Sequence, residues 1–228
     1  MNKIENYVTI ITGAGTGVGK ATAKLLASKG VTVYLIGRRR EKLEEVAKEI
    51  GGNGGRAYAY QADITKIEEV NNLKEYILSQ ESRIDIVINN AGVGGEPITV
   101  HDMTVKEWIE SIELNLNSVF YITNAFLPKM REQKFGHVIS LTSMMVNLNY
   151  EGFSAYASAK AGLEVFMKTL EVEEKKHGIH VSIIDPGNVR SEQNPNGKED
   201  PINIARLIEN CVLFPDEKKN GKIIKAYN

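Results

Sequence analysis

Apolar and polar positions divide this 228-residue chain into two kinds of segment that alternate along its length. Short runs rich in β-branched residues recur, and the most apolar of them are nearly continuous, as in parallel strands buried on both faces. We expect strands at Tyr7–Thr12, Thr32–Ile36, Arg56–Gln61, Ile84–Asn89, His137–Leu141, His180–Ile184 and Lys222–Ala226. Amphipathic segments separate them, at residues 17–29, 40–50, 65–81, 103–132, 155–177 and 201–213. This alternation predicts the α/β class: a doubly wound parallel sheet of seven strands with helices on both faces.

No internal repeat, low-complexity tract or linker divides the chain, so we expect residues 1–228 to form a single domain. The most polar and turn-rich stretch is Glu192–Asp200, which interrupts this fold rather than joining two. Two interpretations stay open for it: a solvated surface loop, or a short lid at about 191–200 that covers a site.

Composition and charge exclude several classes of partner. The chain is 42% hydrophobic and 25% charged, which is typical of soluble globular proteins. It has 28 Lys and Arg against 29 Asp and Glu, so its charge does not favour nucleic acid or an anionic membrane as a partner. Its one cysteine, Cys211, excludes an internal disulfide framework and a thiolate zinc cluster, and we expect no metal site. Because no charged leader precedes an apolar stretch and Tyr7–Thr12 is too short to span a bilayer, we expect a reduced, cytoplasmic location.

A glycine-rich turn, TGAGTGVG at residues 12–19, directly follows the first expected strand and opens a helical pattern. Glycines in such a turn permit close approach of a pyrophosphate to the backbone, and the N-terminus of the helix attracts its negative charge. The same sequence can also form a strand–helix turn that binds no ligand. The candidate cofactor-binding residues in this turn are Gly13, Thr16, Gly17, Val18 and Gly19.

Two kinds of nucleotide-binding motif compete for this turn, and the spacing of its residues excludes one of them. A Walker A loop needs glycine at position 14 and Ser or Thr at position 21, but Ala14 and Ala21 stand there. Because the hydroxyl that would bind Mg²⁺ is missing, phosphoryl transfer is excluded. The G-x-G-x-x-G dinucleotide spacing is absent too, whereas T-G-x-x-x-G-x-G fits. This wider spacing resembles the short-chain dehydrogenase/reductase family.

The end of the second strand bears on the choice between NAD and NADP. An NAD site places an Asp or Glu there to accept hydrogen bonds from the adenosine ribose, and this chain has Gly37 followed by Arg38. Gly37 leaves space for a 2′-phosphate and the Arg38 guanidinium matches phosphate geometry, which predicts NADP(H) as the cofactor. We interpret Arg39 and Arg40 as solvated residues, one of which could assist Arg38.

Tyr156 and Lys160 lie four residues apart in a helical segment, and therefore on one face of it. A Y-x-x-x-K pair alone is weak, because many surface helices carry one. The other site positions that the resemblance assigns, in chain order, are Asp63, Asn90, Gly92, Asn115, Ser143, Pro186, Gly187, Val189 and Ser191. Asp63 has a second interpretation, as the cap of a helix that begins at Thr65. Together these motifs resemble the short-chain family over residues 7–226, and the resemblance implies a Rossmann-type fold.

The resemblance also implies a catalytic set of Asn115, Ser143, Tyr156 and Lys160. A tyrosine hydroxyl titrates at about pH 10, too high for an efficient base at neutral pH, but a nearby ammonium and the positive nicotinamide of NADP⁺ favour the phenolate. We therefore expect Tyr156 to donate a proton in reduction and to accept one in oxidation. As in the family, Lys160 would lower this pKa and bind the nicotinamide ribose. Ser143 would orient the substrate oxygen, and the backbone carbonyl of Asn115 would hold a relay water.

These residues imply an NADP(H)-dependent oxidoreductase that interconverts a carbonyl and an alcohol, either a 3-oxoacyl reductase or a general carbonyl reductase. The rival interpretation is a catalytically silent sensor that binds NADP(H) without turnover. The wall expected around a small-molecule substrate is Met144, Met145, Asn147, Asn149, Tyr150 and Phe153. Two positions depart from the family: Ser191 replaces a common threonine but keeps a hydroxyl, and the chain ends at Asn228 without a Gly-Gly tail.

Resemblance to the family further implies a homo-oligomer, a dimer that can pair into a tetramer through the helical segments at 103–132 and 155–177. Such contacts need an outward apolar strip. The residues that would supply part of it are Val119, Phe120, Phe126, Phe166 and Leu170. The opposite interpretation is that all five face the sheet.

Overall fold

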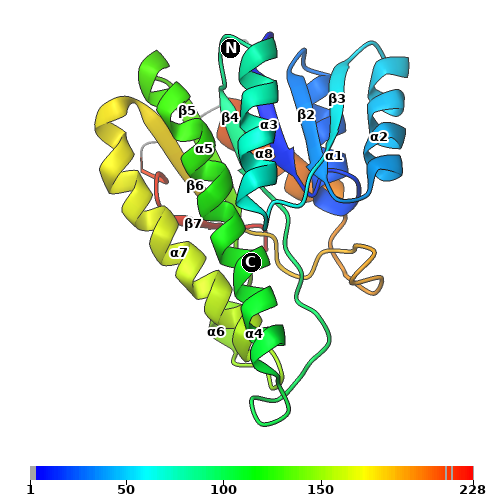
Figure 1. The fold of residues 1–228 in the computed structure, drawn as a ribbon, viewed down its shortest axis with the longest axis vertical. Helices are drawn as coiled ribbons and strands as arrows, with labels where there is room; N and C mark the ends of the chain where they lie inside the picture. Colours follow the sequence, from blue (N-terminus) through cyan, green and yellow to red (C-terminus); the bar gives the residue numbers. More distant parts are fainter. Residues whose placement is uncertain (1–3, 214, 217, 228) are drawn as a thin grey trace.

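A computed structural model describes residues 4–213, 215–216 and 218–227 of the chain. Within them, one parallel sheet of seven strands has the order β3-β2-β1-β4-β5-β6-β7 (Figure 1). The strands are β1 Val8–Thr12, β2 Thr32–Gly37, β3 Arg56–Gln61, β4 Ile86–Asn89, β5 Gly136–Leu141, β6 Ile179–Asp185 and β7 Ile223–Lys225. All seven expected strands are present, and none of their bounds shifts by more than two residues. The predicted fold class is confirmed.

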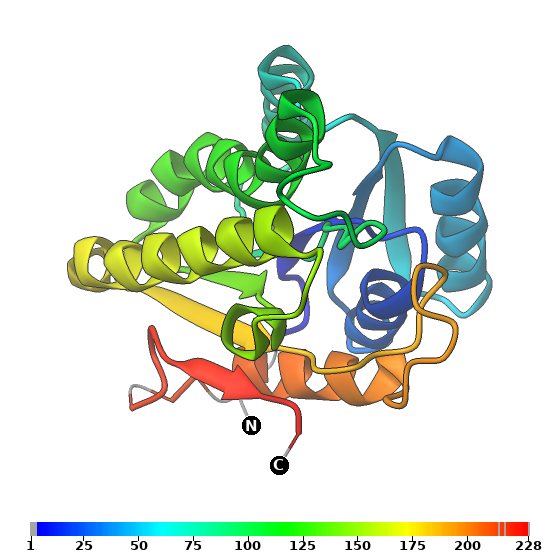
Figure 2. The same cartoon turned by 90° about the horizontal axis from the view of Figure 1, so that it is seen from below.

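Helices cover both faces of this sheet, as Figure 2 shows. One face carries α3 (Ile67–Gln80), α5 (Ser118–Gln133) and α7 (Ser154–Glu174). The other carries α1 (Gly17–Ala27), α2 (Arg40–Gly52) and α8 (Pro201–Leu213). Successive side chains of a strand point to opposite faces of the sheet, so neighbouring residues pack in different cores. Ile10 packs in the first core, under α3, α5 and α7, and Ile11 packs in the second core, under α1, α2 and α8.

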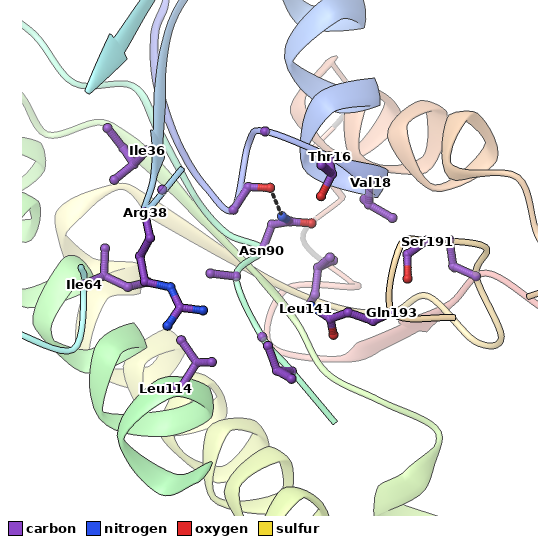
Figure 3. Close-up of a pocket in the computed structure, with 18 of the residues that line it drawn as sticks. Thr16, Val18, Ile36, Arg38, Ile64, Asn90, Leu114, Leu141, Ser191 and Gln193 are labelled. Carbon is purple, nitrogen blue, oxygen red and sulfur yellow. Dashed lines mark hydrogen bonds between the residues drawn. The ribbon is translucent and has the colours of Figure 1, made fainter. Parts of the chain in front are cut away.

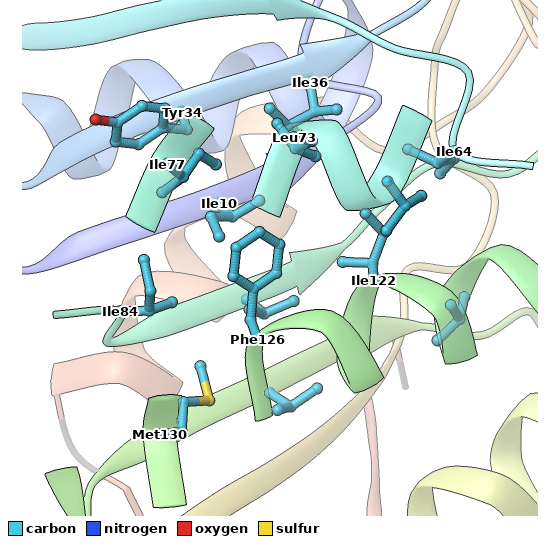
Figure 4. Close-up of a cluster of buried hydrophobic side chains, with 14 of the residues drawn as sticks. Ile10, Tyr34, Ile36, Ile64, Leu73, Ile77, Ile84, Ile122, Phe126 and Met130 are labelled. Atoms are coloured by element: carbon cyan, nitrogen blue, oxygen red, sulfur yellow. The ribbon is translucent and has the colours of Figure 1, made fainter. Parts of the chain in front are cut away.

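Figure 4 shows part of the first core, where Phe126 and Ile122 of α5 point toward Ile10 of β1. Leu73 and Ile77 of α3 complete this part, and all five side chains are fully buried. Burying a side chain of this size contributes about 1.5–3 kcal/mol. The core therefore holds the strands, and with them the turns at their carboxyl ends, in fixed positions.

The strand order reverses beside β1, which has β2 on one side and β4 on the other. Open α/β sheets bind ligands at such a switch point, in the crevice outside the carboxyl ends of the strands. β1 ends at Thr12 and β4 at Asn89, so the turns that follow these two residues meet at this crevice. The glycine-rich turn is one of them.

The helical segment expected at 103–132 is present at residues 105–133, but it is not one regular α-helix. α4 (Val105–Ile112) begins after Thr104, which forms a capping box with Glu107, and a π-helical turn at Glu113–Asn117 separates α4 from α5. A π turn adds a residue to the helical repeat, and such turns are frequent at functional sites. The amphipathic pattern does not show this turn, because the helical run continues through it.

Two further differences concern the segment after β5. A short helix, α6 (Met145–Leu148), follows Ser143, where the sequence predicted only a pocket wall. The helix expected at 155–177 ends at Glu174, and a 3₁₀ turn at Lys175–His177 leads into Gly178. Gly178 has a φ of 75°, the left-handed conformation that ends many helices.

In the described ranges, no helix combines the length and the apolar character needed to cross a bilayer. Across the same residues, no group of three or more His, Cys, Asp or Glu side chains could hold a metal ion. Cys211 lies half-buried on α8, and burial raises the pKa of its thiol.

Candidate active site

The turn between β1 and α1 requires glycine at three positions, for two reasons. Gly13 has a φ of 66° and Gly17 a φ of 52°, conformations that other residues adopt only with strain. At Gly19 the reason is space, because a Cβ there would lie 2.4 Å from the Gly13 carbonyl oxygen. Asn90 Nδ2 ties this turn to β4 by donating to the carbonyl oxygens of Thr12 at 2.9 Å and Gly13 at 3.1 Å (Figure 3). The carboxyl ends of β1 and β4 thus form one connected rim.

This rim borders a cavity of about 480 Å³ that also reaches the end of β2, α7 and the loop after β6. The predicted cofactor-binding residues that line it are Gly13, Thr16, Gly17, Val18, Arg38, Asp63, Asn90, Gly92, Tyr156, Lys160, Pro186, Gly187, Val189 and Ser191. Gly19 is the exception, because it packs behind the turn against Gly13 and Asn90. The sequence did not single out Leu114 and Thr142, which also line the cavity. The only sequence feature that could have indicated their place in the site is that Leu114 precedes Asn115 and Thr142 precedes Ser143.

The three consecutive arginines after β2 have different surroundings. The Arg38 side chain extends into the cavity in Figure 3. Arg39 Nη2 lies 2.7 Å from Glu192 Oε2, and Arg40 Nε lies 2.7 Å from Glu44 Oε1 on the next turn of α2. Arg38 is therefore the guanidinium best placed to meet a phosphate in the cavity, since carboxylates pair with the other two.

Gly37 and Asp63 lie at the same end of the cavity as Arg38. A Cβ on Gly37 would meet nothing closer than the Leu43 side chain at 3.5 Å, so this position has space for a larger group. Asp63 Oδ1 accepts hydrogen bonds from the N–H of Thr65 at 3.1 Å and from its hydroxyl at 2.8 Å. Because α3 begins only at Ile67, the interpretation of Asp63 as the cap of a helix from Thr65 is wrong. Asp63 instead closes a turn that precedes the helix.

Tyr156 and Lys160 line the cavity from one face of α7. Lys160 Nζ lies 5.8 Å from the centroid of the Tyr156 ring and donates to the Leu141 carbonyl oxygen at 2.9 Å. Burial lowers the pKa of the Lys160 ammonium to about 8. Burial also raises the pKa of Tyr156, an effect that the hydrogen bond with Ser143 opposes and the charge of Asp185 reinforces. The free protein therefore keeps Tyr156 protonated at neutral pH.

Gly92 provides the space in which Asn115 and Lys160 come together. A Cβ on Gly92 would lie 2.9 Å from Asn115 Oδ1 and 3.1 Å from Lys160 Nζ. Asn115, fully buried in the π turn, accepts from the Val93 N–H and donates to the Val93 carbonyl oxygen, both at 3.0 Å. Ser143, directly after β5, completes the set, because its hydroxyl acts on Tyr156 and lowers the pKa of that residue. Three separate segments thus bring the four predicted catalytic residues together.

The loop after β6 borders the cavity and is closed by its own hydrogen bonds. The Ser191 hydroxyl accepts from the Asn194 N–H at 3.1 Å, and the backbones of these two residues also bond to each other. The Asn188 carbonyl oxygen accepts from the N–H groups of Lys198 and Glu199, which brings the two ends of the loop together. The stretch is a folded loop at the edge of the cavity, and its closure as a lid stays a prediction.

A second cavity, of about 880 Å³, adjoins Tyr156 on the side of α4. Of the six residues expected to form the substrate wall, Phe153 lines this cavity, and the other five line neither of the two. The physical reason is α6, which begins two residues after Ser143 and carries its segment to the surface. Asn147, Asn149 and Tyr150 are consequently exposed.

Comparison with known proteins identifies the family. The family model of short chain dehydrogenases matches residues 7–201. A 3-oxoacyl-[acyl-carrier-protein] reductase of Synechocystis sp. is 35% identical over 203 residues, covering 89% of this chain and 82% of that protein. A cyclohexanol dehydrogenase of Acinetobacter sp. is 32% identical over 190 residues, covering 83% of this chain and 76% of that protein.

A solved structure of the same family also matches this chain. It is a metagenomic short-chain oxidoreductase in complex with NADP, with a TM-score of 0.88 and 28% identity, and the match covers 98% of this chain and 97% of that one. The glycine turn, the pair of Tyr156 and Lys160 at the cavity, and the match to the family model over most of the chain agree with one another. The chain therefore belongs to the short-chain dehydrogenase family of oxidoreductases.

Proposed function

We propose that this oxidoreductase uses NADP(H) to interconvert a small-molecule carbonyl and its alcohol, with Tyr156 as the acid and base. The observation that carries the proposal is the pairing of Tyr156 and Lys160 at the wall of a cavity whose other end holds Arg38, with Ser143 acting on Tyr156 from the end of β5. The names of the two relatives, a 3-oxoacyl reductase and a cyclohexanol dehydrogenase, support a carbonyl or an alcohol as substrate. The solved relative that contains NADP supports the cofactor.

The residues that line the cavity offer a partner for each part of this cofactor. Gly13 and Gly17 bring the N-terminus of α1 to the cavity, where its backbone N–H groups and dipole would bind the pyrophosphate. Arg38 would bind the 2′-phosphate, and Asp63 would lie beside the adenine. Lys160 would bind the nicotinamide ribose, beside the loop after β6. Bound there, NADPH supplies the hydride for reduction.

Ser143 and Tyr156 would then bind the substrate oxygen. The Ser143 hydroxyl donates a hydrogen bond that orients the carbonyl, and the Tyr156 hydroxyl donates its proton as negative charge develops on that oxygen. Burial keeps Tyr156 protonated, which suits reduction. Oxidation needs the phenolate, which the Lys160 ammonium and the positive charge of the oxidised cofactor stabilise. The Asn115 backbone carbonyl would hold a water that links Lys160 to solvent.

The test is oxidation of NADPH by the purified protein with ketones, diketones and a 3-oxoacyl thioester, with the alcohol product identified. We expect turnover of at least one of these substrates, and a poor rate with NADH in place of NADPH. Turnover of the thioester alone would indicate a 3-oxoacyl reductase, and turnover of simple ketones a general carbonyl reductase. NADPH binding without turnover of any carbonyl would contradict the proposal in favour of a catalytically silent sensor.

A further inference from the structure

The last described residues of the chain lie against the loop that follows β6. β7, red in Figure 2, is the edge strand of the sheet and pairs with the end of β6, with Lys225 opposite Asp185. The Ala226 N–H then donates to the Asp185 carbonyl oxygen at 3.0 Å, and Tyr227 follows at once. The end of the chain is thus placed beside the segment that would face the nicotinamide.

One buried carboxylate joins this chain end to the loop. Asp185 is 2% exposed, and its Oδ2 accepts a hydrogen bond from the Tyr227 hydroxyl at 2.5 Å. Its Oδ1 accepts a second hydrogen bond, from the N–H of Gly187 at 3.0 Å. Removing a partner from a buried carboxylate is costly, because no water replaces the lost hydrogen bond. The carboxylate therefore couples the position of Tyr227 to that of Gly187.

The Tyr227 ring also packs directly against Gly187. Gly187 has a φ of 67°, and a Cβ at this position would lie 2.6 Å from Tyr227 Cδ1. Gly187 and its neighbour Pro186 both line the cavity proposed for the cofactor. The ring and the carboxylate together constrain the backbone of this part of the cavity wall.

The charged groups around Tyr227 keep its hydroxyl a donor. Burial raises the pKa of Tyr227 to about 12, helped by the hydrogen bond and charge of Asp185 and by the charge of Glu164. Glu164 accepts from Thr142 Oγ1 at 2.8 Å, and Lys225 Nζ lies 5.7 Å from the centroid of the Tyr227 ring. Tyr227 therefore donates to Asp185 over the whole neutral pH range.

We propose that Asp185 and Tyr227 are positioning residues that hold the loop of residues 186–191 in the shape that binds the nicotinamide half of the cofactor. This inference rests on the proposed function, because it takes the nicotinamide end of NADP(H) to lie at this loop. It makes the end of the chain, attached through β7, the support of that wall of the site.

Calorimetric titration of Tyr227→Phe tests this role, because the variant keeps the ring against Gly187 and loses the hydroxyl. The two ligands are NADPH and 2′-phospho-ADP, which lacks the nicotinamide half. We expect NADPH affinity to fall about tenfold, the size expected for one hydrogen bond to a charged group, and 2′-phospho-ADP affinity to change by less than about twofold. Tyr58→Phe, which removes the hydroxyl of an exposed tyrosine on β3, is the matched control and should leave both affinities unchanged.

Equal losses for the two ligands, or an unchanged NADPH affinity, would overturn the inference. A wild-type protein that binds neither nucleotide would instead overturn the proposed function, and this inference with it. The two failures are thus distinguishable, and neither readout depends on turnover.

Asp185→Asn adds a second readout, because it keeps the shape of the side chain and removes its charge. The groups that act on Tyr156 are Ser143, Lys160 and Asp185, and the charge of Asp185 raises the pKa of Tyr156. Without this charge the pKa should fall, so the rise of kcat/KM for alcohol oxidation with pH should move to lower pH. Greater exposure of Tyr156 would also lower its pKa, so the shift is assigned to the lost charge only where the variant unfolds at the same temperature as the wild type. An unmoved profile with unchanged NADPH affinity would overturn the role of Asp185.

Discussion

Replacing Tyr156 with phenylalanine removes one hydroxyl group from the wall of the cavity. Tyr156→Phe should therefore bind NADPH nearly as well as the wild type, since the ring and its packing remain. Turnover should fall by about 10²–10⁴, the usual contribution of a positioned acid or base. Steady-state rates together with a direct NADPH titration measure both effects. Retained turnover within about tenfold, a change of ~1.4 kcal/mol in the barrier, would contradict Tyr156 as the acid.

Cofactor choice is the second property that belongs to single residues. Arg38 extends into the cavity, and a charge-assisted contact with a 2′-phosphate is worth about 1.5–3 kcal/mol, a preference for NADPH of roughly ten- to a hundredfold or more. A side chain fits at Gly37, because only Leu43 lies near its Cβ position. The double change Gly37→Asp with Arg38→Ala should therefore reverse the preference, since a carboxylate binds the ribose and repels the phosphate.

The measurement for this prediction is kcat/KM with NADPH and NADH at low salt, where screening does not weaken the contact. Arg38→Ala alone should reduce the preference, and Arg39→Ala, whose partner is Glu192, should change it less. Comparable wild-type values for the two cofactors would show that Arg38 does not select between them.

At the scale of elements, the turn between β1 and α1 depends on the space at Gly19. An added Cβ would lie 2.4 Å from the Gly13 carbonyl oxygen and 2.6 Å from Asn90 Nδ2, so Gly19→Ala must displace the backbone of the turn. We expect the free energy of unfolding to fall by about 1–3 kcal/mol, the usual cost of overpacking, and NADPH binding to be lost. Urea denaturation measures the first effect.

Gly52→Ala is the matched control for this variant. A Cβ at Gly52, in the last turn of α2, would meet nothing within 4 Å. Alanine is also the better helix former there, so the free energy of unfolding should stay equal or rise by up to about 0.5–1 kcal/mol. Equal stability of the two variants would show that the contact at Gly19 relaxes without cost.

At the scale of the whole molecule, the structure shows that only some of the side chains expected at the contact between copies are exposed. Val119, Phe126 and Leu170 are buried and face the sheet, so their assignment to an outward strip is wrong. Phe120 is 48% exposed, and its ring lies 6.1 Å from that of Phe166. Other large apolar side chains exposed on α4 and α7 are Val105, Trp108, Ile109, Val165 and Val172.

We still predict a homo-oligomer, because large apolar side chains that remain exposed commonly form contacts between copies. Light scattering at micromolar concentration should give at least twice the chain mass of 25.3 kDa. Phe120→Asp places a charge beside Phe166 among these exposed side chains, and it should lower this mass without changing the unfolding transition of the monomer. A wild-type mass near that of one chain would reject the prediction.

Local information was enough to determine the fold class and the nucleotide turn. The seven strands follow from hydrophobic runs, and the roles of Gly13 and Gly17 follow from backbone conformations that glycine adopts most readily. The pairing of Tyr156 with Lys160 follows from helical geometry, because residues four apart share a face. In each case the pattern lies within a few neighbouring residues.

Tertiary structure alone decided which distant side chains meet and which helix faces turn outward. Tyr227 reaches Asp185 across 42 positions, and no local pattern encodes that contact. The π turn at Glu113–Asn117 inserts a residue, which rotates everything after it by roughly 100° relative to a continuous α-helix. The burial of Val119 and Phe126 on α5 and of Leu170 on α7 likewise became visible only when these helices packed on the sheet. The phase of a helix against a sheet is set by packing, and packing exists only in the folded chain.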